Sequence, residues 1–208
     1  MHEPQLQSPL HAFGLPALAK SADTSAGVWA NEIPHLGYIS LRGDAGDMAF
    51  VEAASRALGV ALPVRPCAFV HVGALKVLWL SPDEWMIVCA HKHRDGLREK
   101  LSDALKGIRS QAVDNSGGFT QVLLQGRDVS ALLSHTSVYN ISALGSGRVI
   151  GTTLGKSSVY LHRQGDGYCL LLRRSFADYI WRFLVRAAEP YGFGVAGLPE
   201  SVAGGGAK

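Results

Sequence analysis

The sequence predicts an α+β fold made of two β-α-β-β-α modules that pack into one pseudo-symmetric unit. Apolar residues alternate with polar ones in several short runs, as in strands, and recur every three or four residues in longer runs, as in helices. Matching positions of the two halves lie 83 residues apart: Gly43 and Gly126, Leu41 and Leu124, Trp85 and Tyr168, and Leu97 and Ile180. This constant offset indicates an internal duplication.

The chain of 208 residues divides into four predicted segments. Residues 1–35 are rich in Pro, Ser, Ala and Gly and lack periodicity, so we expect an N-terminal arm rather than a packed element. The first module is expected over residues 36–110 and the second over residues 111–195. The Gly-rich residues 196–208 are expected to form a flexible tail.

The first module is predicted to contain a strand, a helix, two strands and a helix. In order, these are YISLRG (38–43), DMAFVEAASRALG (47–59), KVLWL (76–80), WMIVC (85–89) and GLREKLSDALKG (96–107). The last segment places Leu97, Leu101 and Leu105 on one helical face, and both helices end in a glycine, which is a common helix stop.

The second module repeats this order. Its predicted elements are TQVLLQG (120–126), VSALLSHTSVYNI (129–141, helical in its first part), SSVYLHRQ (157–164), GYCLLLR (167–173) and the amphipathic FADYIWRFLVRAAE (176–189). The repetition strengthens each assignment, because every element of one half has a counterpart of the same type in the other.

The stretch VLWLSPDEWMIVC (77–89) places adjacent carboxylates between two tryptophans. Asp83 and Glu84 are either an acid/base pair or part of a turn. The second half has Gln164-Gly165-Asp166-Gly167 at the matching positions, and both tetrapeptides carry the Pro or Gly residues of hairpin turns. We therefore predict a turn. Trp79 and Trp85 are predicted to pack as strand residues, or to anchor a partner if they are exposed.

Charged residues are scarce. The 20 Lys and Arg and 17 Asp and Glu make up 18% of the chain, against about 25% in a typical soluble domain. The centres of protein interfaces are depleted in charge, so this composition fits either a bland free surface or one covered by partner proteins. The net charge of +3 is too small and too dispersed for a nucleic-acid-binding stripe, so no nucleic-acid partner is expected.

The cysteines and the N-terminus bear on the cellular compartment. Cys67, Cys89 and Cys169 are far apart and form no CxxC motif, which favours buried thiols in a reducing compartment. The first residues lack the basic and apolar regions of a secretory signal. No run reaches the roughly 18 apolar residues of a membrane span. We expect a cytoplasmic protein without a membrane partner.

Two glycine-containing motifs resemble nucleotide-binding loops but have the wrong spacing. GTTLGKS (151–157) has three residues, where a phosphate-binding loop needs four, between its first Gly and Gly-Lys, and Lys156 leads into a strand rather than a helix. GSGRVIG (145–151) misses the dinucleotide spacing by one and is expected to be a loop. A nucleotide-binding function would have to rest on GTTLGKS and is disfavoured.

No other cluster predicts a reactive centre. His91 and His93 follow a strand, but no third metal ligand lies near them in the sequence. Asp114, in AVDNSGGFT, is the one candidate for a binding carboxylate; the alternative is a turn in which Asp114 and Ser116 bond to the local backbone. We assign no catalytic, cofactor-binding or metal-ligating residue to this chain.

The order of motifs closely resembles the gamma subunit of heterotetrameric sarcosine oxidase. The matching segments are HLGYISLRGDAGD (35–47), VLWLSPDEWMIVC (77–89), AVDNSGGFTQVLLQG (112–126), RVIGTTLGKSSVYLHR (148–163) and RRSFADYIWRFLVRAAEPYG (173–192). They cover most of residues 35–192, and the SPDEW and RSFADYIW signatures are fairly specific. The N-terminal arm and the tail carry no part of the resemblance.

The resemblance implies a fold similar to the folate-binding fold of the glycine-cleavage T-protein and YgfZ. It also implies a non-catalytic gamma subunit that works with alpha, beta and delta subunits in the oxidative demethylation of sarcosine to glycine, with transfer of the one-carbon unit to tetrahydrofolate. The FAD, FMN, NAD, zinc and tetrahydrofolate of such a complex are expected in the partner subunits and none in this chain. Trp29, Trp79, Trp85 and Trp181 are the candidate anchors for the partners.

A stand-alone tetrahydrofolate-binding or aminomethyltransferase-like protein is the alternative. It needs a carboxylate for the pterin ring, for which Asp114 is the candidate. The chain lacks the KGCYxGQ-type signature of related folate-binding proteins, which disfavours this reading.

Overall fold

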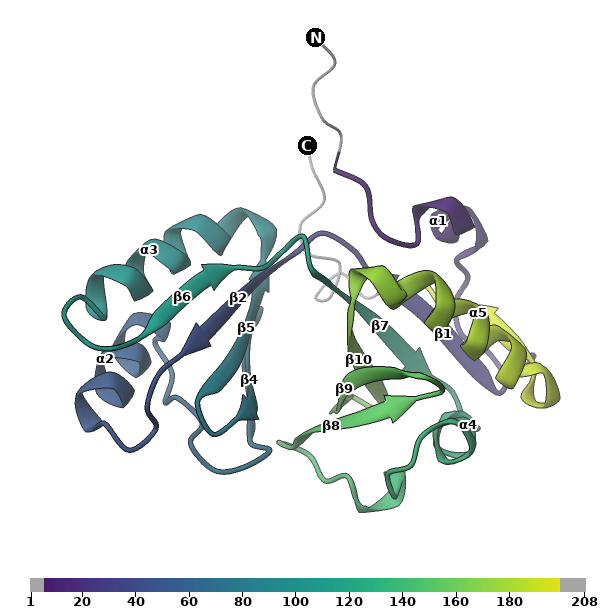
Figure 1. The fold of residues 1–208 in the computed structure, drawn as a ribbon. Helices are drawn as coiled ribbons and strands as arrows, with labels where there is room; N and C mark the ends of the chain where they lie inside the picture. Colours follow the sequence, from purple (N-terminus) through teal and green to yellow (C-terminus); the bar gives the residue numbers. More distant parts are fainter. Residues whose placement is uncertain (1–5, 199–208) are drawn as a thin grey trace, which may run out of the picture.

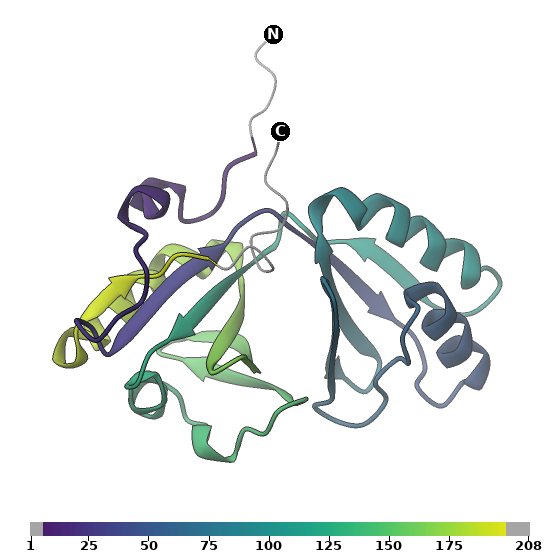
Figure 2. The same ribbon diagram turned by 180° about the vertical axis from the view of Figure 1, so that it is seen from behind.

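The computed structural model describes residues 6–198 and contains four layers: two β-sheets packed face to face, with helices on the outer face of each (Figure 1). This confirms the predicted α+β class. The connections from β1 to β2 and from β6 to β7 pass from one sheet to the other at the same edge of the molecule, as both views show (Figure 2).

The first sheet has the strand order β3-β4-β5-β2-β6, with antiparallel neighbours. Its strands are β2 (Leu36–Arg42), β3 (Phe69–Val72), β4 (Leu75–Ser81), β5 (Glu84–Ala90) and β6 (Gln111–Asp114), and its helices are α2 (Met48–Leu58) and α3 (Arg94–Ala104). Asp47 caps α2 by accepting from the N–H of Ala49 at 2.9 Å, and Gly59 ends the helix in the left-handed region. The helices and the outer face of the sheet enclose one apolar core.

The second sheet has the order β11-β1-β7-β10-β9-β8, in which only β11 and β1 are parallel. Its strands are β1 (Val28–Ile33), β7 (Phe119–Gln125), β8 (Val149–Leu154), β9 (Ser157–Gln164), β10 (Gly167–Arg173) and β11 (Phe193–Val195), and its helices are α4 (Val129–Thr136) and α5 (Ala177–Ala187). The short helices of the chain are η1 (His11–Phe13), α1 (Leu15–Leu18), η2 (His91–His93), η3 (Ile141–Ala143), η4 (Arg174–Phe176) and η5 (Glu189–Tyr191). A second apolar core lies between α4, α5 and this sheet.

The first and last residues of the two predicted modules need correction. Residues 28–33, assigned to an arm, form β1, which lies inside the second sheet with all six residues buried. Residues 111–114, assigned to the second module, form β6 and pair with β2 of the first sheet. Each sheet therefore takes one strand from the other half of the sequence. The β1 sequence VWANEI lacks period-two alternation because both of its faces are covered, so periodicity gave no strand signal.

Three pairs of corresponding elements begin 83 residues apart. This holds for β2 and β7, for β5 and β10, and for α3 and α5. One further prediction is wrong. Part of the expected loop 145–151 belongs to β8. The segment 129–141 is helical in its first part, as predicted: α4 ends at Thr136, because Ser137 is extended and pairs with Leu154 of β8.

The acidic stretch between the tryptophans is a hairpin turn, as predicted. β4 ends at Ser81, β5 begins at Glu84, and the Oγ of Ser81 donates to Oδ1 of Asp83 at 2.8 Å. Glu84 forms an exposed ion pair with Arg42, with 3.1 Å between Oε2 and Nη2. The two carboxylates therefore serve the turn and a surface contact, and they do not face each other as an acid/base pair.

Candidate functional site

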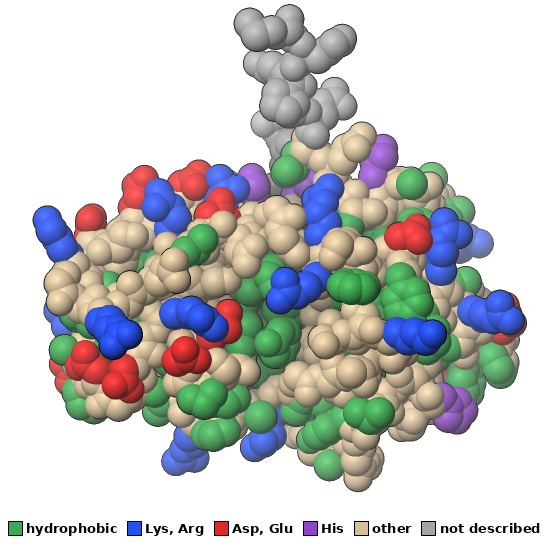
Figure 3. All heavy atoms as spheres, in the orientation of Figure 1, with side chains coloured by type: hydrophobic (Ala, Val, Ile, Leu, Met, Phe, Trp, Pro, Cys, Tyr) green, Lys and Arg blue, Asp and Glu red, His purple; other side chains and the backbone are tan. Residues whose placement is uncertain are grey.

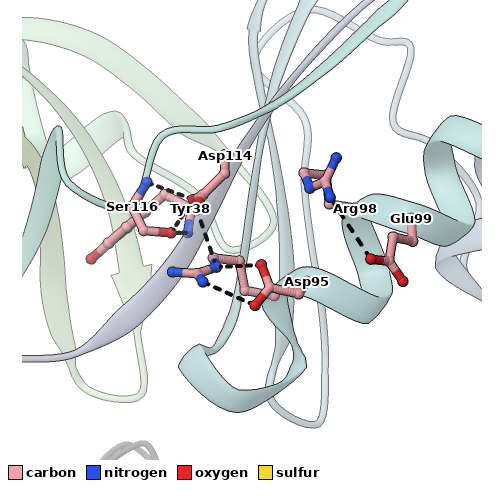
Figure 4. A network of polar contacts seen from close by, with 7 residues as sticks. Tyr38, Asp95, Arg98, Glu99, Asp114 and Ser116 are labelled. Carbon is pink, nitrogen blue, oxygen red and sulfur yellow. Dashed lines mark hydrogen bonds and ion pairs between the residues drawn. The ribbon is translucent and has the colours of Figure 1, made fainter.

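A network of polar contacts lies where the chain crosses from one sheet to the other (Figure 4). We call Tyr38, Arg94, Asp114 and Ser116 the crossover site. Oδ1 of Asp114 accepts from the N–H and the Oγ–H of Ser116, and the Ser116 Oγ accepts from the N–H of Tyr38 at 3.0 Å. The other carboxylate oxygen, Oδ2, lies 3.3 Å from Nε of Arg94. Asp114 therefore makes the predicted local turn contacts, and both of its oxygens are occupied.

A cavity of about 130 Å³ adjoins the crossover site and is also lined by His91, Arg174 and the N-terminal residues 6–9. Two buried atoms beside it, the Tyr38 hydroxyl and Nδ1 of His91, have no hydrogen-bond partner within residues 6–198. Burial, and then the nearby Cys169 and Glu32, raise the pKa of Tyr38 well above its usual value. Ligand pockets usually measure about 300–1,000 Å³, so this cavity is too small to enclose a pterin ring with its substituents.

A second polar group lies between the two sheets, and we call Lys76, Gln121, His162 and Gln164 the inter-sheet cluster. Lys76 is 7% exposed, and its ammonium donates to Oε1 of Gln164 at 2.7 Å and to Oε1 of Gln121 at 3.5 Å. No carboxylate lies within ion-pair distance of it in the described part of the chain. The cation is thus held by two amide oxygens, one from β7 and one from β9.

His162 is neutral within this cluster. Burial, and then the nearby Lys76 ammonium, lower the pKa of His162 from 6.5 to about 3. Nδ1 lies 2.9 Å from the carbonyl oxygen of Arg163, which can only accept, so Nδ1 carries the proton. Nε2 is then a bare acceptor, and among the described residues neither it nor Nε2 of Gln121 has a partner. The ring of Phe69 stacks on that of His162 at a centroid distance of 4.3 Å.

A groove of about 700 Å³ opens between the β4–β5 hairpin and the edge strand β8, and we call it the β8 groove. Its apolar lining includes Leu80, Phe119, Tyr160 and Leu171, and Glu84 and Arg173 are among its polar residues. Figure 3 shows apolar side chains gathered in the hollow between the two halves of the molecule. This volume falls within the range of ordinary binding sites.

The tryptophans proposed as exposed anchors are mostly core residues, which corrects that expectation. Trp29, Trp85 and Trp181 are at most 3% exposed. The Nε1–H of Trp85 donates to the carbonyl oxygen of Pro63 at 2.7 Å, and its ring packs on Phe50. Trp79 is half-buried against the same core. The apolar positions with high exposure lie elsewhere, with Val138 at 86%.

The cysteine and glycine motifs behave as the sequence indicates. Cys89 and Cys169 are buried free thiols, and burial raises the pKa of both, to about 11 for Cys89. Lys156 stands in the tight turn between β8 and β9 and opens no helix, which rules out a phosphate-binding loop at GTTLGKS. Over residues 6–198, no three His, Cys, Asp or Glu side chains gather as metal ligands. Within the same range, no helix has the length and apolar character needed to cross a bilayer.

Lys76, Gln121 and His162 of the inter-sheet cluster were not predicted as site residues from the sequence. The signal for them is the two-residue period of a strand. Lys76 shares a strand face with Leu78 and Leu80, and His162 shares one with Tyr160, so all of them face the other sheet. The sequence pattern does not distinguish a strand face that meets solvent from one that meets a second sheet. The structure shows that both faces of each sheet are covered.

Two comparisons with known proteins identify the family. The family model described as "Sarcosine oxidase, gamma subunit family" matches residues 42–189. A chain of the heterotetrameric sarcosine oxidase from Corynebacterium sp. U-96, solved in complex with pyrrole 2-carboxylate, is 26% identical, with a TM-score of 0.79 over 93% of this chain and 98% of that one. A search of curated proteins gives no match.

A more distant structure shares the fold. The glycine cleavage system aminomethyltransferase T from Bartonella henselae has a TM-score of 0.69 at 18% identity. The alignment covers 96% of this chain but only 61% of that one. At this identity the likeness concerns the fold alone.

Proposed function

This chain belongs to the sarcosine oxidase gamma subunit family, and on that premise we propose that it is the non-catalytic gamma subunit of a heterotetrameric sarcosine oxidase. The observation that carries the proposal is the end-to-end match to one chain of such an enzyme, which covers 98% of that chain.

The proposed division of labour follows. The alpha, beta and delta subunits hold the FAD, FMN, NAD, zinc and tetrahydrofolate and carry out the oxidation of sarcosine to glycine and the one-carbon transfer, in the cytoplasm. This chain supports their assembly. We also propose that its two halves descend from one duplicated unit of the T-protein/YgfZ-like folate-binding fold, which the offset of 83 residues shared by three pairs of corresponding elements supports.

Co-expression with the three other subunits tests the proposal. Omitting this chain should abolish the stable complex and its sarcosine-dependent oxygen uptake. Asp114→Asn, with the exposed turn variant Asp166→Asn as its control, should leave oxygen uptake per complex unchanged, because Asp114 is expected to bond only within this chain. A three-subunit preparation with full activity, or oxidation of sarcosine by the isolated chain, would refute the proposal.

A stand-alone tetrahydrofolate-binding protein is the second candidate, and the likeness to aminomethyltransferase T supports it at the level of fold. The crossover site argues against it, because both oxygens of Asp114 are occupied and the adjoining cavity measures about 130 Å³. Calorimetry of the isolated chain with tetrahydrofolate separates the two candidates. Binding that Asp114→Asn abolishes would favour the second.

A further inference from the structure

The edge of β8 that faces away from β9 forms backbone hydrogen bonds at its two ends but not in its middle. At its start, the N–H of Val149 donates to the carbonyl oxygen of Cys67 at 2.9 Å, and the N–H of Phe69 donates to that of Gly147 at 2.8 Å. At its end, the N–H of Gly155 donates to the carbonyl oxygen of Thr136 at 3.0 Å. Both flanking segments run antiparallel to β8, pairing Ala68 with Arg148 and Ser137 with Leu154.

The positions between these contacts are vacant. Peptide groups of a strand point alternately to its two sides. Since the N–H groups of Val149 and Gly155 point away from β9, those of Gly151 and Thr153 point the same way. The N–H and C=O of Gly151 and the N–H of Thr153 have no backbone partner within residues 6–198. The unpaired window spans residues 150–153 and is closed at both ends by this chain.

The window adjoins the apolar surface of the β8 groove. A residue paired with Gly151 would share its face of the sheet with Tyr160, which is the partner of Gly151 on β9. Because Gly151 has no side chain, the Tyr160 ring lies across it, with its Cε1 3.3 Å from the position a Cβ would take. An apolar side chain opposite Gly151 would therefore contact the Tyr160 ring, which also lines the β8 groove.

The charges of the groove favour an acidic neighbour. Glu84 is already paired with Arg42. Arg173 is exposed, lies with its guanidinium 5.8 Å from the ring centre of Phe119, and has no carboxylate partner in the described chain. The unneutralised charge of the β8 groove is thus positive, and an occupant with a carboxylate near Arg173 is complementary to it.

We propose that the β8 edge receives an extended segment of a partner subunit, about four residues long and antiparallel to β8, with an apolar residue opposite Gly151 and an acidic residue beside Arg173. This rests on the proposed function and specifies the contact. The mode is strand addition to a free sheet edge. The edge of a second copy does not fit, because each copy's own flanking segments close the window at both ends. An exposed loop or chain end does fit.

Hydrogen exchange of the isolated chain and of the assembled complex tests the contact residue by residue. On assembly, the amides of Gly151 and Thr153 should exchange about fivefold more slowly, the factor that corresponds to one ordinary hydrogen bond. Thr152 and Leu154 already face β9, so their exchange should not change. This alternation distinguishes strand addition from general burial, which would slow all four amides. If Gly151 and Thr153 exchange as fast in the complex as in the isolated chain, the inference is wrong.

A matched pair of variants provides the second test. Thr153→Pro removes the outward N–H and blocks the edge, whereas Thr153→Val keeps the N–H and a similar shape. Thr153→Pro should weaken assembly about fivefold or more and Thr153→Val should not, with urea unfolding of both isolated chains as the check on folding. Normal assembly by a folded Thr153→Pro variant would overturn the contact but leave the proposed function standing. Failure of the wild-type chain to join the complex would overturn both. Protection that grows with the concentration of the isolated chain would indicate a second copy.

Discussion

The ammonium of Lys76 in the first sheet lies 2.7 Å from Oε1 of Gln164 in the second, so a buried cation joins the two halves of the molecule. Two amide oxygens hold this charge, with no carboxylate within ion-pair distance in residues 6–198. Such an arrangement is costly to break from one side only, because a buried acceptor that loses its donor is left unsatisfied.

Lys76→Met should therefore destabilise the chain by about 1–3 kcal/mol, whereas Lys76→Met combined with Gln121→Leu and Gln164→Leu should recover most of that loss. Urea unfolding of the isolated chain measures both. Lys92→Met, at an exposed position, is the control and should change stability by no more than about 0.5 kcal/mol. A triple variant less stable than the single one would show that the amides are not held by Lys76.

His162 should make stability fall in acid. Burial, and then Lys76, lower its pKa to about 3, whereas in the unfolded chain it has its ordinary value of 6.5. Between pH 6.5 and pH 3 the His162 imidazole is protonated in the unfolded state but not in the folded state. The free energy of unfolding is therefore highest above pH 6.5 and decreases as the pH falls towards 3. The slope reaches about 1.4 kcal/mol per pH unit.

Replacing His162 by Phe keeps a ring against Phe69 and removes this titration. Urea unfolding between about pH 7 and pH 4.5 should show a shallower decline for His162→Phe than for the wild type, by roughly one proton. The exposed His93→Phe should follow the wild type. Parallel curves for wild type and His162→Phe would contradict the neutral, buried imidazole.

Replacing the two tryptophans of the β4–β5 hairpin by alanine should reduce the stability of the chain by different amounts. Trp85 is fully buried and donates to the Pro63 carbonyl, so Trp85→Ala should cost about 3–5 kcal/mol of unfolding free energy. Trp79, directly opposite on β4 and half-buried, should cost about 1–2 kcal/mol when changed to Ala. Chemical denaturation measures both. Equal losses would mean that Trp79 is buried in solution, for instance against another chain.

Gly126 and Gly165 both have a positive φ, but only Gly126 also lies close to another part of the backbone. Gly126 has φ +113°, and a Cβ there would collide with the carbonyl oxygen of Gly27. Gly165 has φ +57° in an open hairpin turn, with nothing within 4 Å. Gly165→Ala should cost about 1–2 kcal/mol and Gly126→Ala clearly more, because a backbone oxygen cannot move aside cheaply. The thermal midpoints of the two variants test this order.

Local features of this chain were predictable because their causes are local. Pro82 and its neighbours determine the hairpin at Asp83, and Asp47 and Gly59 determine the two ends of α2. The local turn after Asp114 depends on its hydrogen bonds with Ser116. The family resemblance added the role as a subunit, which short-range patterns alone do not contain.

The crossover site could be predicted only in part. Asp114 was recognised as a turn residue, but its ion pair with Arg94 joins β6 to the start of α3 and depends on β6 pairing with β2. The inter-sheet cluster was missed altogether, because Lys76 and His162 lie 86 positions apart in the sequence and meet only when the sheets pack.

By itself, the sequence determined the α+β class, the strands and helices with clear periodicity, the hairpin turns and the family, since each depends on residues that are close in the chain or on the order of motifs along it. Only the tertiary structure decided that β1 and β6 exchange sheets, that three of four tryptophans are internal, and that the edge of β8 stays open over residues 150–153. The physical reason is that burial and backbone pairing are completed by distant segments, and a strand covered on both faces carries no periodic signal.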